Sequence, residues 1–183
     1  MNDWLWYLTR ASGIVATVLM AAALAWGFLF SARETGNRLR PAWWLDLHNW
    51  LGGLALVFTG VHLLAVFADS DLALGLVDIL VPNSATTQTA AITWGVVALY
   101  LLAAVVFTSW PKRRFKRPVW RAIHLLSVPA TLFAGIHGYQ TGSDATAFGF
   151  RALLVVLAGA AVYPAAIRLF GLVSSNRARP LDT

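Results

Sequence analysis

Five long apolar stretches, separated by short charged segments, constrain the fold of this 183-residue chain more than any other feature. A helix needs about 20 mostly apolar residues to cross roughly 30 Å of bilayer hydrocarbon, and each stretch meets that requirement. They run approximately over residues 6–30, 45–68, 90–109, 119–139 and 148–173. We therefore expect an all-α integral membrane protein, built as a bundle of about five transmembrane helices.

The composition favours the same class. Hydrophobic residues make up 58% of the chain and charged residues 12%, which is too little polar surface for a soluble domain of this size. The net charge of +6 is compatible with nucleic-acid binding, but the cations cluster between apolar stretches, as they do in cytoplasmic loops of membrane proteins. We expect contact with membrane lipid and no nucleic-acid partner.

Basic and acidic residues alternate on successive loops. Basic residues fill the first loop, the third loop and the tail: Arg33, Arg38, Arg40, Lys112, Arg113, Arg114, Lys116, Arg117, Arg168, Arg177 and Arg179. Aspartates fill the second and fourth loops: Asp69, Asp71, Asp78 and Asp144. The positive-inside rule then predicts an outer N-terminus and a cytoplasmic C-terminus in the cell (plasma) membrane. Residues 1–176 are expected to form one membrane domain and 177–183 a short cytoplasmic tail.

The second loop is long and partly apolar. Residues 71–81 are compatible with a short helix on the outer surface, ended by Pro82, or with an ordinary ordered loop.

All four histidines fall inside apolar stretches, as two similarly spaced pairs. His48 and His62 are 14 residues apart on the second stretch, and His124 and His137 are 13 apart on the fourth. Those two helices run parallel, so His48 faces His124 near the cytoplasm and His62 faces His137 roughly 20 Å away. Two levels of paired imidazoles favour two bis-histidine haems, since one zinc ion needs converging ligands. The alternative is four buried, hydrogen-bonded histidines.

The helical period fits one pair better than the other. Fourteen residues at about 100° each return to within about 40° of the start, whereas thirteen miss by about 140°. Pro129 lies between His124 and His137, where it removes a hydrogen bond to the carbonyl of Leu125. We predict a kink or local rewinding there that corrects the phase.

Cations and glycines near these histidines are candidate contacts for haem. Arg121, one turn before His124, is expected to bind an inner haem propionate. Arg10 either binds an outer propionate or extends to the lipid headgroups. Certain glycines either admit a flat macrocycle or serve close helix packing: Gly52, Gly53, Gly60 and Gly138. Gly13 and Gly27 on the first stretch repeat the 14-residue spacing.

The chain resembles the ferric reductase-like transmembrane domain family, whose relatives include NADPH oxidase membrane domains and the haem-binding subunit of the methionine sulfoxide reductase system. The resemblance rests on three segments, LTRASG (8–13), DLHNWLGG (46–53) with His62, and WRAIHLLS (120–127) with Ile136-His137-Gly138. It implies two b-type haems on the four histidines and electron transfer across the membrane. The chain departs from the family in showing five stretches instead of six and no G-x-G-x-x-G segment.

We therefore expect a di-haem membrane cytochrome b that relays electrons from a cytoplasmic flavoprotein or quinol to an outer acceptor, such as ferric iron. It would be an oxidoreductase component without its own flavin domain. The lack of cysteine excludes covalent haem attachment and iron–sulfur clusters. The alternatives are a subunit that donates electrons to a separate periplasmic reductase, a quinol-linked respiratory cytochrome b, and a protein whose histidines bind no haem.

Overall fold

The computed structural model describes residues 3–32, 41–110, 115–143 and 145–177, and within these ranges the chain is helical and contains no β-strand. The elements are α1 (Asp3–Ala32), α2 (Pro41–Ala68), the 3-10 helix η1 (Ser70–Leu72), α3 (Leu76–Leu80), α4 (Thr89–Ser109), α5 (Arg117–His124), α6 (Ser127–Thr141) and α7 (Phe148–Arg177). The all-α prediction is confirmed. Several loop and tail charges used to predict the orientation lie outside the described residues: Arg33, Arg38, Arg40, Lys112, Arg113, Arg114, Asp144 and Arg179.

Four helical segments among the described residues are long and apolar enough to cross a membrane. They are Trp4–Ser31, Ala42–Ala68, Thr89–Ser109 and Arg117–Thr141, and α7 adds a shorter apolar segment, Phe148–Ala160. Large apolar side chains such as Trp110 (85% exposed) and Phe148 (87% exposed) point away from the protein interior. Such surfaces are unfavourable in water and are compatible with lipid, so the chain is a multi-pass membrane protein.

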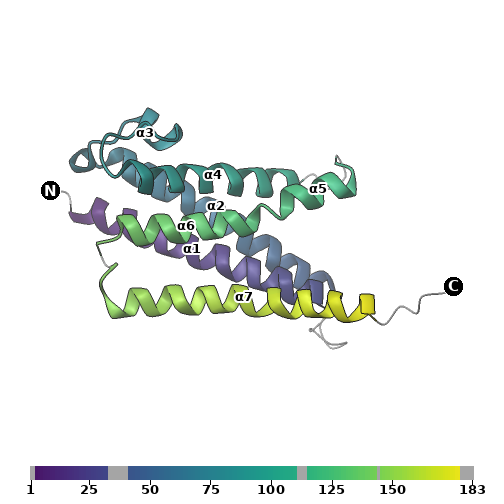
Figure 1. The fold of residues 1–183 in the computed structure, drawn as a ribbon. Helices are drawn as coiled ribbons and strands as arrows, with labels where there is room; N and C mark the ends of the chain where they lie inside the picture. Colours follow the sequence, from purple (N-terminus) through teal and green to yellow (C-terminus); the bar gives the residue numbers. More distant parts are fainter. Residues whose placement is uncertain (1–2, 33–40, 111–114, 144, 178–183) are drawn as a thin grey trace.

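The bundle is held together by a few extensive helix contacts. α1 packs along α2 and α7, while α4 packs along α6, and the helices run roughly alongside one another (Figure 1). One residue from each of α1, α2, α4 and α6 meets in the core: Met20, Ala55, Leu102 and Ala130. Ala55 and Ala130 are fully buried, and their small side chains let the helix backbones approach closely.

The predicted fourth helix is divided into α5 and α6 at Leu125 and Leu126. Pro129 has no N–H, so the carbonyl of Leu125 lacks its usual partner four residues later. That carbonyl instead accepts from the Val128 N–H at 3.1 Å, and the Leu126 N–H donates to the Ile123 carbonyl at 3.0 Å. Both are three-residue hydrogen bonds that wind the backbone more tightly than an α-helix. The break expected near Pro129 is therefore present, one turn before the proline.

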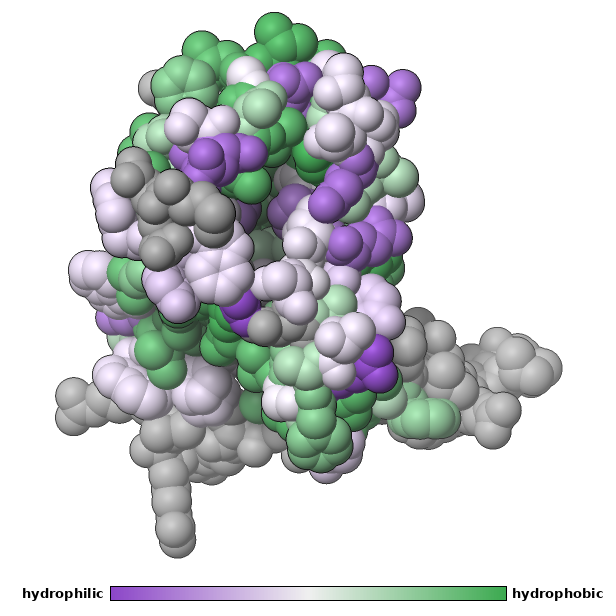
Figure 2. Space-filling model, turned by 90° about the vertical axis from the view of Figure 1, so that its left-hand side faces the viewer, coloured by the Kyte–Doolittle hydropathy of each residue, from purple (hydrophilic) through white to green (hydrophobic). Residues whose placement is uncertain are grey.

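The second loop folds over one end of the bundle as η1 and α3, so a short helix does form, but only over Leu76–Leu80. Asp69 Oδ1 accepts from the Asp71 N–H at 3.1 Å, and Asp78 Oδ2 accepts from the Gly75 N–H at 2.9 Å. Two of the four aspartates of the second and fourth loops therefore cap local structure. Figure 2 shows this end of the molecule, where hydrophilic residues gather and the surface is hollowed near its middle.

Candidate functional site

The four histidines form two pairs between α2 and the α5–α6 segment, with the ring planes of each pair tilted or nearly perpendicular to one another. The His48 and His124 ring centroids lie 5.7 Å apart with an interplanar angle of 59°. The His62 and His137 centroids lie 6.1 Å apart at 82°. The predicted pairing across the two helices, His48 with His124 and His62 with His137, matches this geometry.

Each imidazole is held through Nδ1. His62 Nδ1 lies 2.7 Å from the Thr9 carbonyl and His48 Nδ1 lies 3.1 Å from the Ala23 carbonyl, both on α1. His137 Nδ1 lies 2.8 Å from the Ala91 carbonyl on α4. A carbonyl oxygen only accepts, so these three rings carry hydrogen on Nδ1 and a lone pair on Nε2. Nε2 is therefore the nitrogen available to bind a metal ion.

The fourth imidazole contacts a side chain instead. His124 Nδ1 lies 3.2 Å from the hydroxyl oxygen of Ser109, the last residue of α4. The Trp120 ring, one turn earlier on α5, stacks on the His124 ring with centroids 4.9 Å apart at 23°. Trp120 is therefore packed against a candidate ligand.

Glycines on α1 and α4 make room for the histidine rings. A Cβ at Gly13 would lie 3.0 Å from His62 Nδ1, and one at Gly27 would lie 3.2 Å from His48 Cε1. A Cβ at Gly95 would lie 2.8 Å from His137 Nδ1. In each case the accepting carbonyl belongs to the residue four positions before the glycine. The spacing of Gly13 and Gly27 thus has a structural cause, because the two glycines seat the two rings of α2.

These positions form three layers along the bundle. We name the layers after the predicted orientation. The outer layer contains Gly13, His62, Gly95 and His137; the inner layer contains Gly27, His48, Ser109 and His124. The core residues Met20, Ala55, Leu102 and Ala130 form the central layer. On α1, α2 and α4 the central residue lies seven positions from both of its neighbours, which is about 10 Å along a helix. The two histidine pairs are therefore separated by a packed apolar layer.

The outer pair opens into a cavity of about 330 Å³. Its walls are mainly apolar and come from α1, α2, α4, α6 and α7, with α7 contributing Phe150, Leu153, Leu154 and Leu157. Polar residues also line it: Thr9, Arg10, Asp69, Gln88 and Ser143. The Thr9 hydroxyl oxygen is buried without a hydrogen-bond partner. An apolar pocket with a few polar groups is typical of a small-molecule or cofactor site.

Arg10 lies at this cavity. Its Nη1 donates to Ser143 Oγ at 3.1 Å, and its Cζ lies 4.7 Å from the Trp6 ring centroid. The guanidinium thus joins α1 to the loop after α6, beside the outer histidine pair. This placement is compatible with the predicted contact between Arg10 and an acidic group of an outer cofactor.

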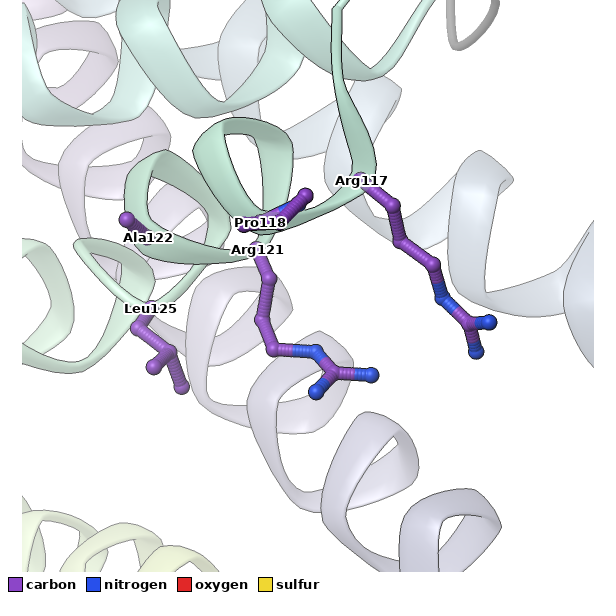
Figure 3. Close-up of a pocket in the computed structure, with 5 residues that line it drawn as sticks. All are labelled: Arg117, Pro118, Arg121, Ala122 and Leu125. Atoms are coloured by element: carbon purple, nitrogen blue, oxygen red, sulfur yellow. The ribbon is translucent and has the colours of Figure 1, made fainter.

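Arg121 lies at the other end of the bundle. It lines an open depression on α5 together with Arg117, Pro118, Ala122 and Leu125. Arg117 and Arg121 extend in similar directions from α5 (Figure 3), and both are exposed. Nearby, the Trp120 Nε1 is buried without a hydrogen-bond partner. Two cations and one buried donor therefore lie on α5, within two turns before His124.

Three glycines of α2 face open space. A Cβ at Gly52, Gly53 or Gly60 would meet no other atom within 4 Å, so close helix packing does not explain these glycines, and their other predicted role, admitting a flat macrocycle, stays a prediction. On α4, Trp94 packs on Phe133, with centroids 4.9 Å apart. Sequence reasoning missed Gly95 and Ser109, although their spacing of 14 residues on the third stretch repeats that of Gly13 and Gly27.

Comparison with protein families matches residues 12–135, well over half of the chain, to the ferric reductase like transmembrane component. The matched region contains His48, His62 and His124 and ends two residues before His137. No curated protein and no solved structure matches the chain. Membership of this family supports a role in electron transfer at a membrane. The chain belongs to the ferric reductase-like transmembrane family.

Proposed function

We propose that the protein is a di-haem b-type cytochrome that relays electrons from one face of the membrane to the other. The observation that carries the proposal is the presence of two imidazole pairs, with centroid distances of 5.7 and 6.1 Å. Two imidazoles that bind one first-row metal ion from opposite sides, each through a metal–nitrogen bond of about 2 Å, place their ring centroids roughly 6 Å apart. The spacing thus suits bis-histidine ligation at both levels.

The surroundings of the outer pair fit a haem. The Nδ1 bonds of His62 and His137 to backbone carbonyls fix both rings and leave Nε2 for the iron. The apolar cavity beside them reaches Gly135, where a Cβ would meet no other atom within 4 Å, so a flat macrocycle can approach α6. Arg10 and the buried Thr9 hydroxyl provide polar contacts for the anionic edge of such a ligand.

At the inner level, His48 and His124 are the proposed ligands. Arg121 and the buried Trp120 Nε1 are the proposed partners of the acidic groups. Haem bound in this way supplies one-electron exchange at each level. The protein holds the imidazoles at fixed depths, excludes water with the central layer of Met20 and Leu102, and spaces the two sites for transfer.

The proposed direction is from a cytoplasmic flavoprotein or quinol, through the inner pair and then the outer pair, to an acceptor outside the cell membrane. Ferric iron and a separate periplasmic reductase are the candidate acceptors that follow from the family resemblance. The polar lining of the outer cavity, which includes Gln88 and Ser143, supports access from that end.

Four alanine variants, at His48, His124, His62 and His137, test the ligand assignment on the purified full chain. We expect two b haems per wild-type chain. His48→Ala and His124→Ala should lose the same haem, and His62→Ala and His137→Ala the other, as identified by redox potential and low-spin spectrum. Asn49→Ala, next to His48 on an exposed position of α2, is the matched control and should keep both haems. Full haem content in all four histidine variants would overturn the proposal.

A further inference from the structure

The two proposed sites differ in how their imidazoles are held. Three Nδ1 atoms contact backbone carbonyls, of Thr9, Ala23 and Ala91, whereas His124 Nδ1 contacts the Ser109 side chain. A backbone carbonyl is present whatever the side chain, but the hydroxyl depends on the residue at position 109. The hydrogen bond to Nδ1 at the inner pair therefore depends on the identity of one side chain.

Ser109 occupies the fourth position of a regular pattern. Along α1, Gly13 and Gly27 lie seven residues before and after the core residue Met20; along α4, Gly95 and Ser109 lie seven residues before and after Leu102. Three of these four positions are glycines that seat a histidine ring. At the fourth, a side chain fills the space and provides the hydrogen-bonding atom.

We propose that Ser109 is a positioning residue for His124 that makes the inner site electronically different from the outer one. The inference rests on the proposed haem ligation by these histidines. With Nε2 bound to iron, Nδ1 of His124 carries hydrogen and the Ser109 oxygen accepts it. A hydroxyl is a weaker acceptor than a helix carbonyl, so it withdraws the Nδ1 hydrogen less and makes the imidazole a less electron-rich ligand. The ferric form is then stabilised less than it would be by a carbonyl partner.

The test uses redox titration and low-temperature spin-resonance spectra of the purified full chain with its own haem. Ser109→Ala removes the acceptor, so the midpoint potential of one haem should rise and one low-spin signal should move, while the other haem keeps both values. Ser109→Thr retains the hydroxyl and should keep the wild-type midpoint potentials and low-spin signals. Thr108→Ala is the matched control, because the Thr108 hydroxyl donates to the Ala104 carbonyl of its own helix at 2.6 Å. It should change neither potential.

Ser109→Gly is a second variant that should fold even if Ser109→Ala does not, because glycine occupies the other three positions. It also removes the hydroxyl and should alter the same haem. Loss of one haem in Ser109→Ala that Ser109→Thr restores would also support the proposal. Wild-type potentials and spectra in both Ser109→Ala and Ser109→Gly would overturn it, as would a haem loss that threonine does not restore. If the wild-type chain bound no haem, the proposed function itself would fail, so the two failures are distinguishable.

Discussion

Replacing Gly95 with alanine should weaken haem binding at the outer pair. The added Cβ would lie 2.8 Å from Nδ1, 2.9 Å from Cε1 and 3.0 Å from Cγ of His137, whereas ordinary contacts begin at 3.4 Å. The ring must therefore move by several tenths of an ångström, which also bends its 2.8 Å hydrogen bond to the Ala91 carbonyl. Overpacking of this kind costs about 1–3 kcal/mol, which corresponds to roughly 5- to 150-fold weaker binding.

The effect should be graded across the three ring-seating glycines. The closest Cβ contact is 2.8 Å at Gly95, 3.0 Å at Gly13 and 3.2 Å at Gly27, so the loss of binding should decrease in that order. Gly95→Ala and Gly13→Ala should affect the outer haem, and Gly27→Ala the inner one. Gly159→Ala on α7 is the control, because its Cβ would meet no atom within 4 Å.

The assay is haem transfer from each purified variant to an excess of a competing haem-binding protein, followed by its absorbance. Unfolding should be measured in parallel, since alanine stabilises a helix interior by about 1 kcal/mol relative to glycine. Wild-type retention of the outer haem in Gly95→Ala, or a larger loss in Gly27→Ala than in Gly95→Ala, would refute the reasoning.

Two further changes test the helix break and the outer cation. Pro129→Ala restores an N–H that can pair with the Leu125 carbonyl, so α5 and α6 should join and turn His124 away from His48. Haem content should then fall from two to one per chain. Unchanged haem content would contradict the role given to the break. Arg10→Gln removes the cation at the outer cavity and should weaken outer-haem retention by roughly 1.4- to 5-fold, with Arg10→Lys in between, because a partly exposed ion pair contributes about 0.2–1 kcal/mol. Haem transfer measures this second effect, and equal retention in Arg10→Gln and the wild type would exclude the contact.

The spans and the histidine pairing were predictable because they depend on properties local to each stretch. Apolar length defines a membrane helix, and parallel helices bring residues of equal depth together. The break near Pro129 was predictable for the same reason, since a missing N–H affects the carbonyl four residues earlier. Of the two outcomes predicted there, a kink or local rewinding, the structure shows rewinding through the tighter hydrogen bonds of Leu126 and Val128.

The partners of the imidazoles were harder to predict because they depend on the register between helices. Nothing local to Ser109 or Gly95 shows which histidine it meets; that follows from how α4 packs against α5 and α6. The 14-residue spacing of Gly13 and Gly27 on α1 recurs as Gly95 and Ser109 on α4, and this repeat is the sequence signal that points to the second pair. By contrast, a Cβ at Gly52, Gly53 or Gly60, on the same helix as two histidines, would meet no other atom within 4 Å.

Haem quantitation with a reduced-minus-oxidised spectrum of the purified wild-type chain tests the central claim most directly. We predict two haems per chain, both with the narrow bands of low-spin b-type haem with two imidazole ligands, because each of the two levels holds one imidazole pair. A colourless protein that stays colourless after haem is supplied would contradict the claim.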